Sequence, residues 1–307
     1  MTAATASPAV SPMTQVVNGL LAIKPLWNVA KWQARTMMIK RAERLGIPWR
    51  ETVKTYQAQD WDQTWQQAIN PDLTYPDYYQ ASFHGYDQGH LCWEAAFEFE
   101  VAANAVHSSL YPEAGAKGDL QLRQSYHDVL LAHLPQAPQR ILDLHCTVGL
   151  SSFTLQACYP QARLTGLDFS PYYVTLAHYN GQQQQSEINW VHALPEATGL
   201  DAQSFDLVSA FLLFHEMPQD AARRIFREAR RLVKAGGNFT FMDMNPRSQA
   251  YVTMPPYVMT LLKSTEPFMD QYLALDIEAE LLAAGFDHVE IYPNSSRHRT
   301  AIATVQP

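Results

Sequence analysis

Residues 141–152 read ILDLHCTVGLSS, an apolar run that stops at a loop containing a single glycine. An apolar strand that ends in such a loop and leads into a helix is typical of cofactor-binding turns in open α/β sheets. Gly149 supplies the glycine, but His145 stands where these loops usually have their first one. The stretch therefore predicts a cofactor-binding turn and leaves open how closely the ligand can approach it.

Short apolar runs alternate with amphipathic stretches from Arg140 to the end of the chain. This alternation predicts a parallel sheet covered by helices on both faces. Gly236 and Gly237 are the expected stop of the helix before the fifth strand. The predicted strands are 140–144, 163–168, 188–192, 206–213, 238–243, 288–294 and 300–305, and the predicted helices are 150–158, 171–180, 218–233 and 275–286.

The chain before residue 135 has a different character. Apolar residues recur at helical spacing in 25–45, in a stretch beginning at Trp49, and in 93–109 and 119–134. Residues 70–93 contain two prolines, two glycines and many aromatic residues, which predicts a long ordered loop. We expect a disordered lead over 1–13, a helical aromatic-rich region over 14–134 that covers the site, and a cofactor-binding domain over 135–307.

Composition narrows the class of protein. Residues 24–54 hold eight basic and two acidic side chains, a net of +6, which leaves −14 for the rest of the chain. A strongly acidic body argues against a general nucleic-acid binder. The three cysteines have no metal-ligand spacing, and the N-terminus has no apolar signal segment, so we expect a cytoplasmic protein. No apolar run reaches the 18 or so residues of a membrane span.

Four motifs occur in a definite order after residue 140. They are LDLHCTVG (142–149), LTGLDFSP (164–171), SFDLVSAFLLFHEMP (204–218) and REARRLVKAGGNFTFMDMNP (227–246). Together with the closing helix and two strands, they resemble the class I S-adenosylmethionine-dependent methyltransferases over about residues 120–305. The resemblance implies an α/β fold, with a seven-stranded doubly wound sheet and a reversed C-terminal β-hairpin.

The resemblance also implies a set of residues that bind S-adenosylmethionine. Asp168 would bind the ribose hydroxyls, because a carboxylate can accept from both, although a strand-end aspartate can also cap the following helix. Phe169 would lie beside the adenine, and the backbone of Phe211 would face the methionine amino group. The positions expected at the methionine part are Asp143, His145, Cys146 and Gly149, and those expected after the third strand are Ala193 and Leu194.

Two departures from the family pattern bear on affinity. His145 replaces the first glycine, and histidine tolerates positive φ better than most residues, so the turn can survive. VHALPEATG (191–199) lacks the aspartate that often binds the adenine amino group. If the His145 side chain blocked the cofactor pocket, the protein would be a catalytically decayed methyltransferase fold that acts as a binding or scaffold protein. This is the main alternative to an active enzyme. A nicotinamide-dependent oxidoreductase is disfavoured, since no G-x-G-x-x-G follows the first strand.

The end of the fourth strand carries the candidate catalytic residues. His215 is the candidate general base, with a packing or capping role as the alternative, and Glu216 either orients it or starts the next helix. His84, Asp87 and His90 are close in sequence, but without helical spacing or further ligands we expect no metal site. Candidate substrate-contacting residues are Tyr79, His84, Tyr86, Trp93, Tyr126, His127 and Asn245.

The sequence thus predicts methyl transfer from S-adenosylmethionine to a small, apolar or aromatic acceptor, and no nucleic-acid partner. The basic segment 24–45 could lie on an anionic membrane surface. The favoured alternative is a helix packed on the rest of the protein, because Trp27 and Trp32 suit intramolecular packing. The acceptor, the methylated atom and the oligomeric state are not predicted.

Overall fold

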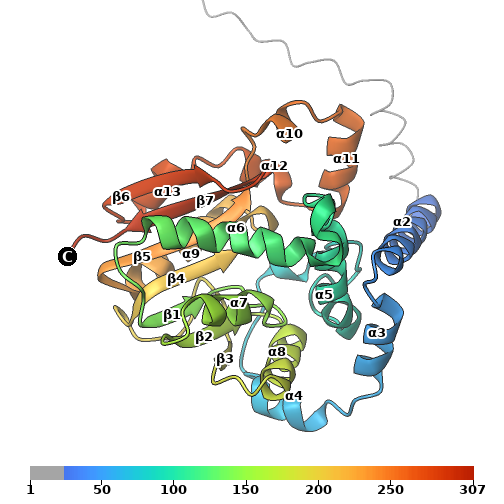
Figure 1. The fold of residues 1–307 in the computed structure, drawn as a ribbon, viewed down its shortest axis with the longest axis horizontal. Coiled ribbons are helices and arrows are strands. Elements are labelled where there is room, and N and C mark those ends of the chain that lie inside the picture. Colours follow the sequence, from blue (N-terminus) through green and yellow to red (C-terminus); the bar gives the residue numbers. More distant parts are fainter. Residues whose placement is uncertain (1–23) are drawn as a thin grey trace, which may run out of the picture.

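The computed structural model describes residues 24–307, so the predicted lead over 1–13 lies outside the described residues. Seven strands form one sheet in the order β3-β2-β1-β4-β5-β7-β6 (Figure 1). The first five run parallel, and β7 lies antiparallel between β5 and β6. This confirms the predicted sheet and its reversed hairpin. The strands are β1 (Arg140–Asp143), β2 (Arg163–Asp168), β3 (Asn189–His192), β4 (Phe205–Phe211), β5 (Val233–Met244), β6 (His288–Pro293) and β7 (His298–Thr304).

Helices cover both faces of the sheet because successive strand residues point to opposite sides. Ile141 belongs to a buried cluster with helices α6 and α7, whereas its neighbour Leu142 belongs to a cluster with α9 and α13. Tyr126 joins α6 to the sheet through its hydroxyl, 2.8 Å from Ser209 Oγ and 2.6 Å from Thr240 Oγ1. These helices and α8 are α6 (Gly118–His133), α7 (Leu150–Cys158), α8 (Pro171–Gln183), α9 (Gln219–Leu232) and α13 (Ile277–Ala283).

The fifth strand begins earlier than its sequence pattern predicts. Helix α9 ends at Leu232, and β5 starts at Val233 rather than at Asn238. The two glycines therefore lie inside the strand, where Gly236 has φ +77° and the pairing with β4 shifts register. A bulge of this kind accommodates positive φ without ending the strand, which explains the wrong boundary.

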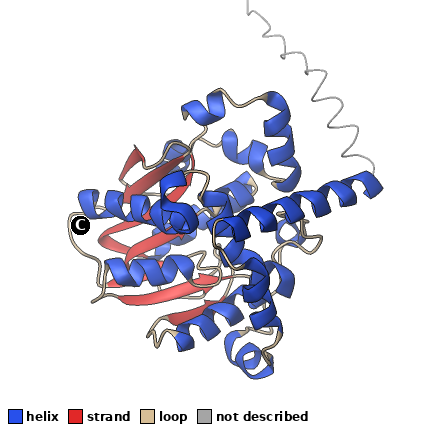
Figure 2. Ribbon diagram, turned by 45° about the vertical axis from the view of Figure 1, so that its right-hand side comes forward, coloured by secondary structure: helices blue, strands red, loops and turns tan. Residues whose placement is uncertain are grey.

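The described residues before α6 are mainly helical, as predicted, and gather at one side of the sheet (Figure 2). Between α4 and α5, residues 69–92 contain only the short 3-10 turn η1, which agrees with the predicted long loop. The elements before α6 are α2 (Lys24–Arg44), α3 (Trp49–Gln57), α4 (Asp62–Ala68), η1 (Asp77–Gln80), α5 (Trp93–His107) and η2 (Pro112–Lys117). The segment after β5 forms α10 (Gln249–Val252), α11 (Pro256–Thr265) and α12 (Met269–Leu273).

Glu98 of α5 connects four parts of this region. Its carboxylate is buried and accepts hydrogen bonds from Arg35 on α2, from Trp49 Nε1 on α3 at 3.2 Å, and from the hydroxyl of Tyr86 at 2.7 Å. The shared acceptor holds the long loop and two helices against α5. The predicted domain boundary at residue 135 stays a prediction, although α6 before it packs on the sheet.

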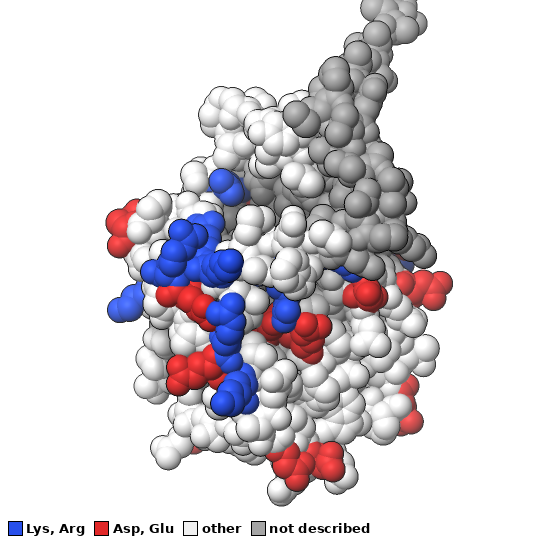
Figure 3. Space-filling view, turned by 90° about the vertical axis from the view of Figure 1, so that its right-hand side faces the viewer, with Lys and Arg blue, Asp and Glu red and all other residues white. Residues whose placement is uncertain are grey.

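Helix α2 is less covered than the sequence suggested. It packs on α5 through Ile39 and Ala42, but Trp32 is 65% exposed, so the expected intramolecular packing of this tryptophan is wrong. Trp27 has no described side chain. Figure 3 shows lysine and arginine side chains gathered on the face that α2 and α3 share. Among the described helices, none has the length and apolarity to cross a membrane.

Candidate active site

The loop after β1 is shaped by two residues with positive φ. Thr147 has φ +49° and Gly149 has φ +97°. We expected the non-glycine residue with positive φ to be His145, but it is Thr147. A Cβ on Gly149 would lie 2.7 Å from the ring of Phe153, which explains the single glycine. Cys146 lies buried in the loop, where its amide donates to Leu167 O at 3.0 Å.

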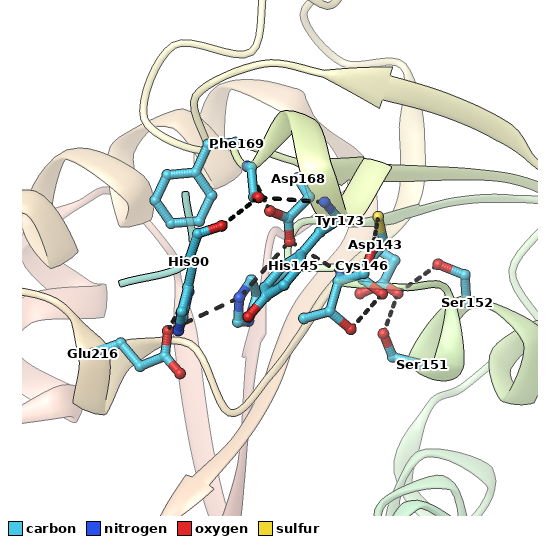
Figure 4. A network of polar contacts seen from close by, with 12 residues as sticks. His90, Asp143, His145, Cys146, Ser151, Ser152, Asp168, Phe169, Tyr173 and Glu216 are labelled. Carbon is cyan, nitrogen blue, oxygen red and sulfur yellow. Dashed lines mark hydrogen bonds and ion pairs between the residues drawn. The ribbon is translucent and has the colours of Figure 1, made fainter. Parts of the chain in front are cut away.

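Asp143 is fully buried at the end of β1. Its Oδ2 accepts from the hydroxyls of Ser151 and Ser152 at 2.6 and 2.7 Å, while its Oδ1 has no hydrogen-bond partner (Figure 4). Burial raises the pKa of Asp143, and the two serine hydroxyls oppose this rise. A buried acceptor without a donor is costly, so Oδ1 is an atom that a bound ligand could satisfy.

His145 lies inside the site and is only 2% exposed. Neither ring nitrogen has a hydrogen-bond partner, and Nε2 lies 3.7 Å from Asp168 Oδ2 and 4.0 Å from Glu216 Oε2. Burial lowers the pKa of His145 to about 3, so the ring is neutral. The side chain therefore occupies space beside the cofactor loop without adding charge.

Asp168 at the end of β2 is held by backbone amides. Oδ2 accepts from the amide of Thr147 at 3.0 Å and Oδ1 from that of Ser170 at 2.8 Å. The helix cap is Ser170, whose hydroxyl accepts from Tyr173 N, so Asp168 does not itself cap α8. Burial raises the pKa of Asp168 to about 7 despite these amides. A carboxylate offers about four acceptor positions, which leaves two for hydroxyl groups.

The expected adenine position is covered in this conformation. The ring of Tyr79 stacks on Phe169 with centroids 3.6 Å apart. An adenine on this face therefore requires Tyr79 to move away.

The long loop is also fastened at the end of β3. His192 Nδ1 accepts from the amide of Asn70 at 2.9 Å, and its Nε2 lies 3.1 Å from the hydroxyl of Tyr75. Both ring nitrogens of His192 are thus engaged by the loop. Ala193 is buried, and its amide donates to Asp168 O at 3.1 Å, while Leu194 is half-buried.

His215 lies in the short turn η3 (Phe214–Glu216) after β4 and pairs with a residue to which the sequence motifs give no role. Its Nδ1 is 2.8 Å from Oδ1 of Asp243 at the end of β5. Burial opposes the charged ring, but the adjacent carboxylate outweighs it and raises the pKa of His215 to about 10. Asp243 was visible in the fifth-strand motif, but its pairing depends on the adjacency of β4 and β5.

Glu216 points toward histidines of other segments rather than toward His215. Its Oε2 lies 3.6 Å from His90 Nδ1, and its Oε1 lies 3.9 Å from His84 Nε2 (Figure 4 shows His90 and Glu216 facing each other). Burial raises the pKa of Glu216 to about 8. The carboxylate that contacts the His215 ring is that of Asp243 and not that of Glu216.

The structure separates the candidate substrate residues. Tyr79 and His84 lie at the strand ends, whereas Tyr86 donates to Glu98. Trp93 stacks on Trp61 with centroids 5.2 Å apart, in an aromatic cluster near α4. The other three substrate candidates lie elsewhere: Tyr126 and His127 are buried on α6, and Asn245 accepts from the amide of Arg247. Phe211, expected at the methionine part of the cofactor, has the Arg123 guanidinium over its ring.

Sequence comparisons show which proteins this chain resembles. Residues 141–237 match the model described as a methyltransferase domain. An uncharacterised methyltransferase of Synechocystis is 30% identical over 53% of this chain and 74% of its own length. A ubiquinone biosynthesis O-methyltransferase of Coxiella burnetii is 31% identical over 40% of this chain. The match covers 53% of that relative, so this chain spans about half of its length.

The fold comparison agrees. The solved structure of a candidate O-methyltransferase from Nostoc punctiforme superposes with a TM-score of 0.55 at 14% identity, over 86% of this chain and 72% of that one. At this identity the likeness shows the fold alone. Taken with the Synechocystis relative, the sheet order and the strand-end carboxylates, it leads to one conclusion: the chain belongs to the S-adenosylmethionine-dependent methyltransferases of class I.

Proposed function

We propose that this protein transfers a methyl group from S-adenosylmethionine to a small, apolar or aromatic acceptor. The observation that carries the proposal is the pair of buried carboxylates at adjacent strand ends, Asp143 and Asp168, with unused acceptor capacity. Relatives named for ubiquinone biosynthesis and demethylmenaquinone methylation support an acceptor of this class.

The residues present fit the cofactor. Asp168 would accept from the ribose hydroxyls, and Oδ1 of Asp143 would receive a donor from the methionine side, together with the loop from His145 to Gly149. Phe169 would contact the adenine once Tyr79 has left its face. When bound, the cofactor supplies an electrophilic methyl group, and the protein mainly positions the two reactants.

His215 is the proposed residue on the acceptor side. Its Nδ1 is held by Asp243, so Nε2 is the ring atom left to contact an acceptor. Paired with Asp243, the His215 ring is better suited to donate a hydrogen bond to an oxygen of the methyl acceptor than to act as the general base that the sequence predicts.

The proposal is tested by calorimetric titration with S-adenosylmethionine and with S-adenosylhomocysteine. We expect micromolar binding, about −8 kcal/mol, because the acceptor atoms are in place. The product should bind as well, since it keeps the ribose and the amino acid. Binding to neither compound would favour the alternative scaffold protein, for which the stacking of Tyr79 on Phe169 is the specific support. The His145→Gly variant would then test whether this side chain closes the site.

Cofactor affinity should depend on pH through Asp168. Burial raises the pKa of this carboxyl to about 7, so it is protonated below pH 7 and loses part of its ability to accept from two hydroxyls. We expect the affinity to be constant above about pH 8 and to fall below pH 7 by up to tenfold per pH unit. Titrations between pH 5.5 and 8.5 measure this, and Asp168→Asn should remove the dependence. A flat wild-type profile would contradict the assignment.

Peripheral membrane contact also stays a proposal. Val29, Trp32 and Met37 are exposed on α2, which also carries basic side chains. Such a surface suits access to a lipophilic acceptor.

A further inference from the structure

We propose that His84, His90 and Glu216 form a binding site for a divalent transition-metal ion at the strand ends, beside the cofactor loop. The site joins two parts of the chain: the histidines come from the long loop over residues 69–92, and the glutamate follows β4. Their ligand atoms all lie within 4.8 Å of one another. Only folding brings Glu216 to these two histidines, which is why the short sequence HGYDQGH alone predicted no site.

The spacing of the ligand atoms is close to that of a coordinated ion. Glu216 lies 3.9 Å from His84 Nε2 and 3.6 Å from His90 Nδ1. In a tetrahedral site with bonds of about 2.0–2.1 Å, two ligand atoms are about 3.3–3.4 Å apart. The two contacts use different oxygens of Glu216, Oε1 and Oε2, and the three ligand atoms lie within 4.8 Å of one another, so the side chains would have to turn toward a shared ion to reach this spacing.

The cluster contains buried polar atoms that nothing in the described chain satisfies. His90 is 3% exposed, yet neither of its ring nitrogens has a hydrogen-bond partner, and Glu216 Oε2 also has none. Leaving such a buried polar atom unpaired is unfavourable. A metal ion would bind a ring nitrogen and a carboxylate oxygen at once, and so offset this cost.

Neighbouring residues hold the ligands and add negative charge. Ser170 Oγ donates to the carbonyl of His90 at 2.7 Å, and the amide of His84 donates to Thr265 O at 3.1 Å. Glu266 Oε1 lies 3.0 Å from His84 Nε2, a contact that an ion bound to this nitrogen would replace, and the second oxygen of Glu266 has no partner. His84, His215 and Glu266 form a second possible set that shares His84. The carboxylates favour a cation, and backbone contacts of this kind fix ligand orientation.

The ligand types select the class of metal. Two imidazoles with one carboxylate suit zinc or iron(II), whereas magnesium and calcium prefer sites made of oxygen ligands. Three protein ligands leave an open coordination position, and His84 is partly exposed, which gives access. If the proposed methyl transfer holds, this position would bind an acceptor oxygen and lower the pKa of its hydroxyl group.

The test uses the full chain without an affinity tag, stripped with a chelator and titrated with Co²⁺. We expect one ion per chain with a micromolar or lower Kd and visible absorption bands of a site with nitrogen and oxygen ligands. Zn²⁺ should displace the Co²⁺. Absence of stoichiometric binding by the wild-type chain would overturn the proposal without reference to any variant.

Matched variants locate the ion. His84→Ala and Glu216→Gln should each weaken Co²⁺ binding by about 100-fold or more, since even indirect ligand partners change affinity 10- to 100-fold. The control is His288→Ala on β6, whose side chain is 63% exposed and distant in the sheet order from β4, and its affinity should stay unchanged. Circular dichroism and Tm without metal establish that each variant is folded. Equal binding by His84→Ala and the wild type would place the ion elsewhere and refute the site.

The metal site and the methyl-transfer proposal can fail separately. Calorimetry with S-adenosylmethionine on the metal-free chain reports on the cofactor pocket alone. Metal binding without cofactor binding would retain the metal site and remove the methyl-transfer role, whereas cofactor binding without metal binding would refute this inference only.

Discussion

Asp168→Ala is expected to lower the affinity for S-adenosylmethionine by about 100- to 1,000-fold. The substitution removes both carboxylate oxygens that would accept from the ribose, and hydrogen bonds to a charged group contribute about 1.5–3 kcal/mol each. It also leaves the amides of Thr147 and Ser170 without their acceptor, so the cofactor loop loses one of its contacts with β2. Calorimetry measures the affinity, and methyl transfer should fall with it.

Two controls separate a binding effect from unfolding. Asp201→Ala removes an exposed carboxylate in the segment between β3 and β4 and should leave affinity unchanged. Thermal denaturation without the cofactor reports how far Asp168→Ala weakens the fold itself. An affinity equal to that of the wild type, in a folded variant, would rule out Asp168 as the ribose ligand.

Glu98→Ala is expected to lower the free energy of unfolding of the N-terminal region by about 3–5 kcal/mol. The carboxylate is 1% exposed and accepts from three side chains of separate segments. Its removal leaves the indole N–H of Trp49 and the hydroxyl of Tyr86 buried without their acceptor, and it leaves a cavity. Urea denaturation followed by tryptophan fluorescence measures the change.

Glu94→Ala is the matched control for this effect. Glu94 is on the same helix and pairs with the same arginine, Arg35, at 2.9 Å, but its side chain is 57% exposed. Exposed ion pairs contribute little because water screens them, so we expect a change within about 0.5 kcal/mol. A similar loss of unfolding free energy in both variants would mean that the contacts of Glu98 with Trp49 and Tyr86 do not contribute to stability.

The sheet could be predicted because its signals are local. Alternation of short apolar and amphipathic stretches depends on neighbours within a few residues, and it located all seven strands. Boundaries were less secure: β5 begins five residues early because a bulge, formed only by pairing with β4, takes up Gly236. The exposure of Trp32 was also wrong, since helical spacing indicates which face is apolar and not what covers it.

The positions of the candidate cofactor residues on single loops could be predicted, but their detailed conformation could not. Asp143 and Asp168 were expected at strand ends and lie there. The positive φ is at Thr147 instead of His145, and the amide of Thr147 donates to Asp168 at the end of a different strand, a contact that local sequence does not indicate. The partner of His215 was missed because it lies on a different strand.

By itself, the sequence determined the succession of strands and helices along the chain, the family motifs and the positions of the strand-end carboxylates. Each of these follows from hydrophobic periodicity or from residues close together in the chain. Only the tertiary structure placed Tyr79 on Phe169 and brought Glu216 to His84 and His90. Those contacts join segments about 90 to 130 residues apart, and their geometry depends on how the long loop packs across the sheet, which no local pattern of side chains encodes.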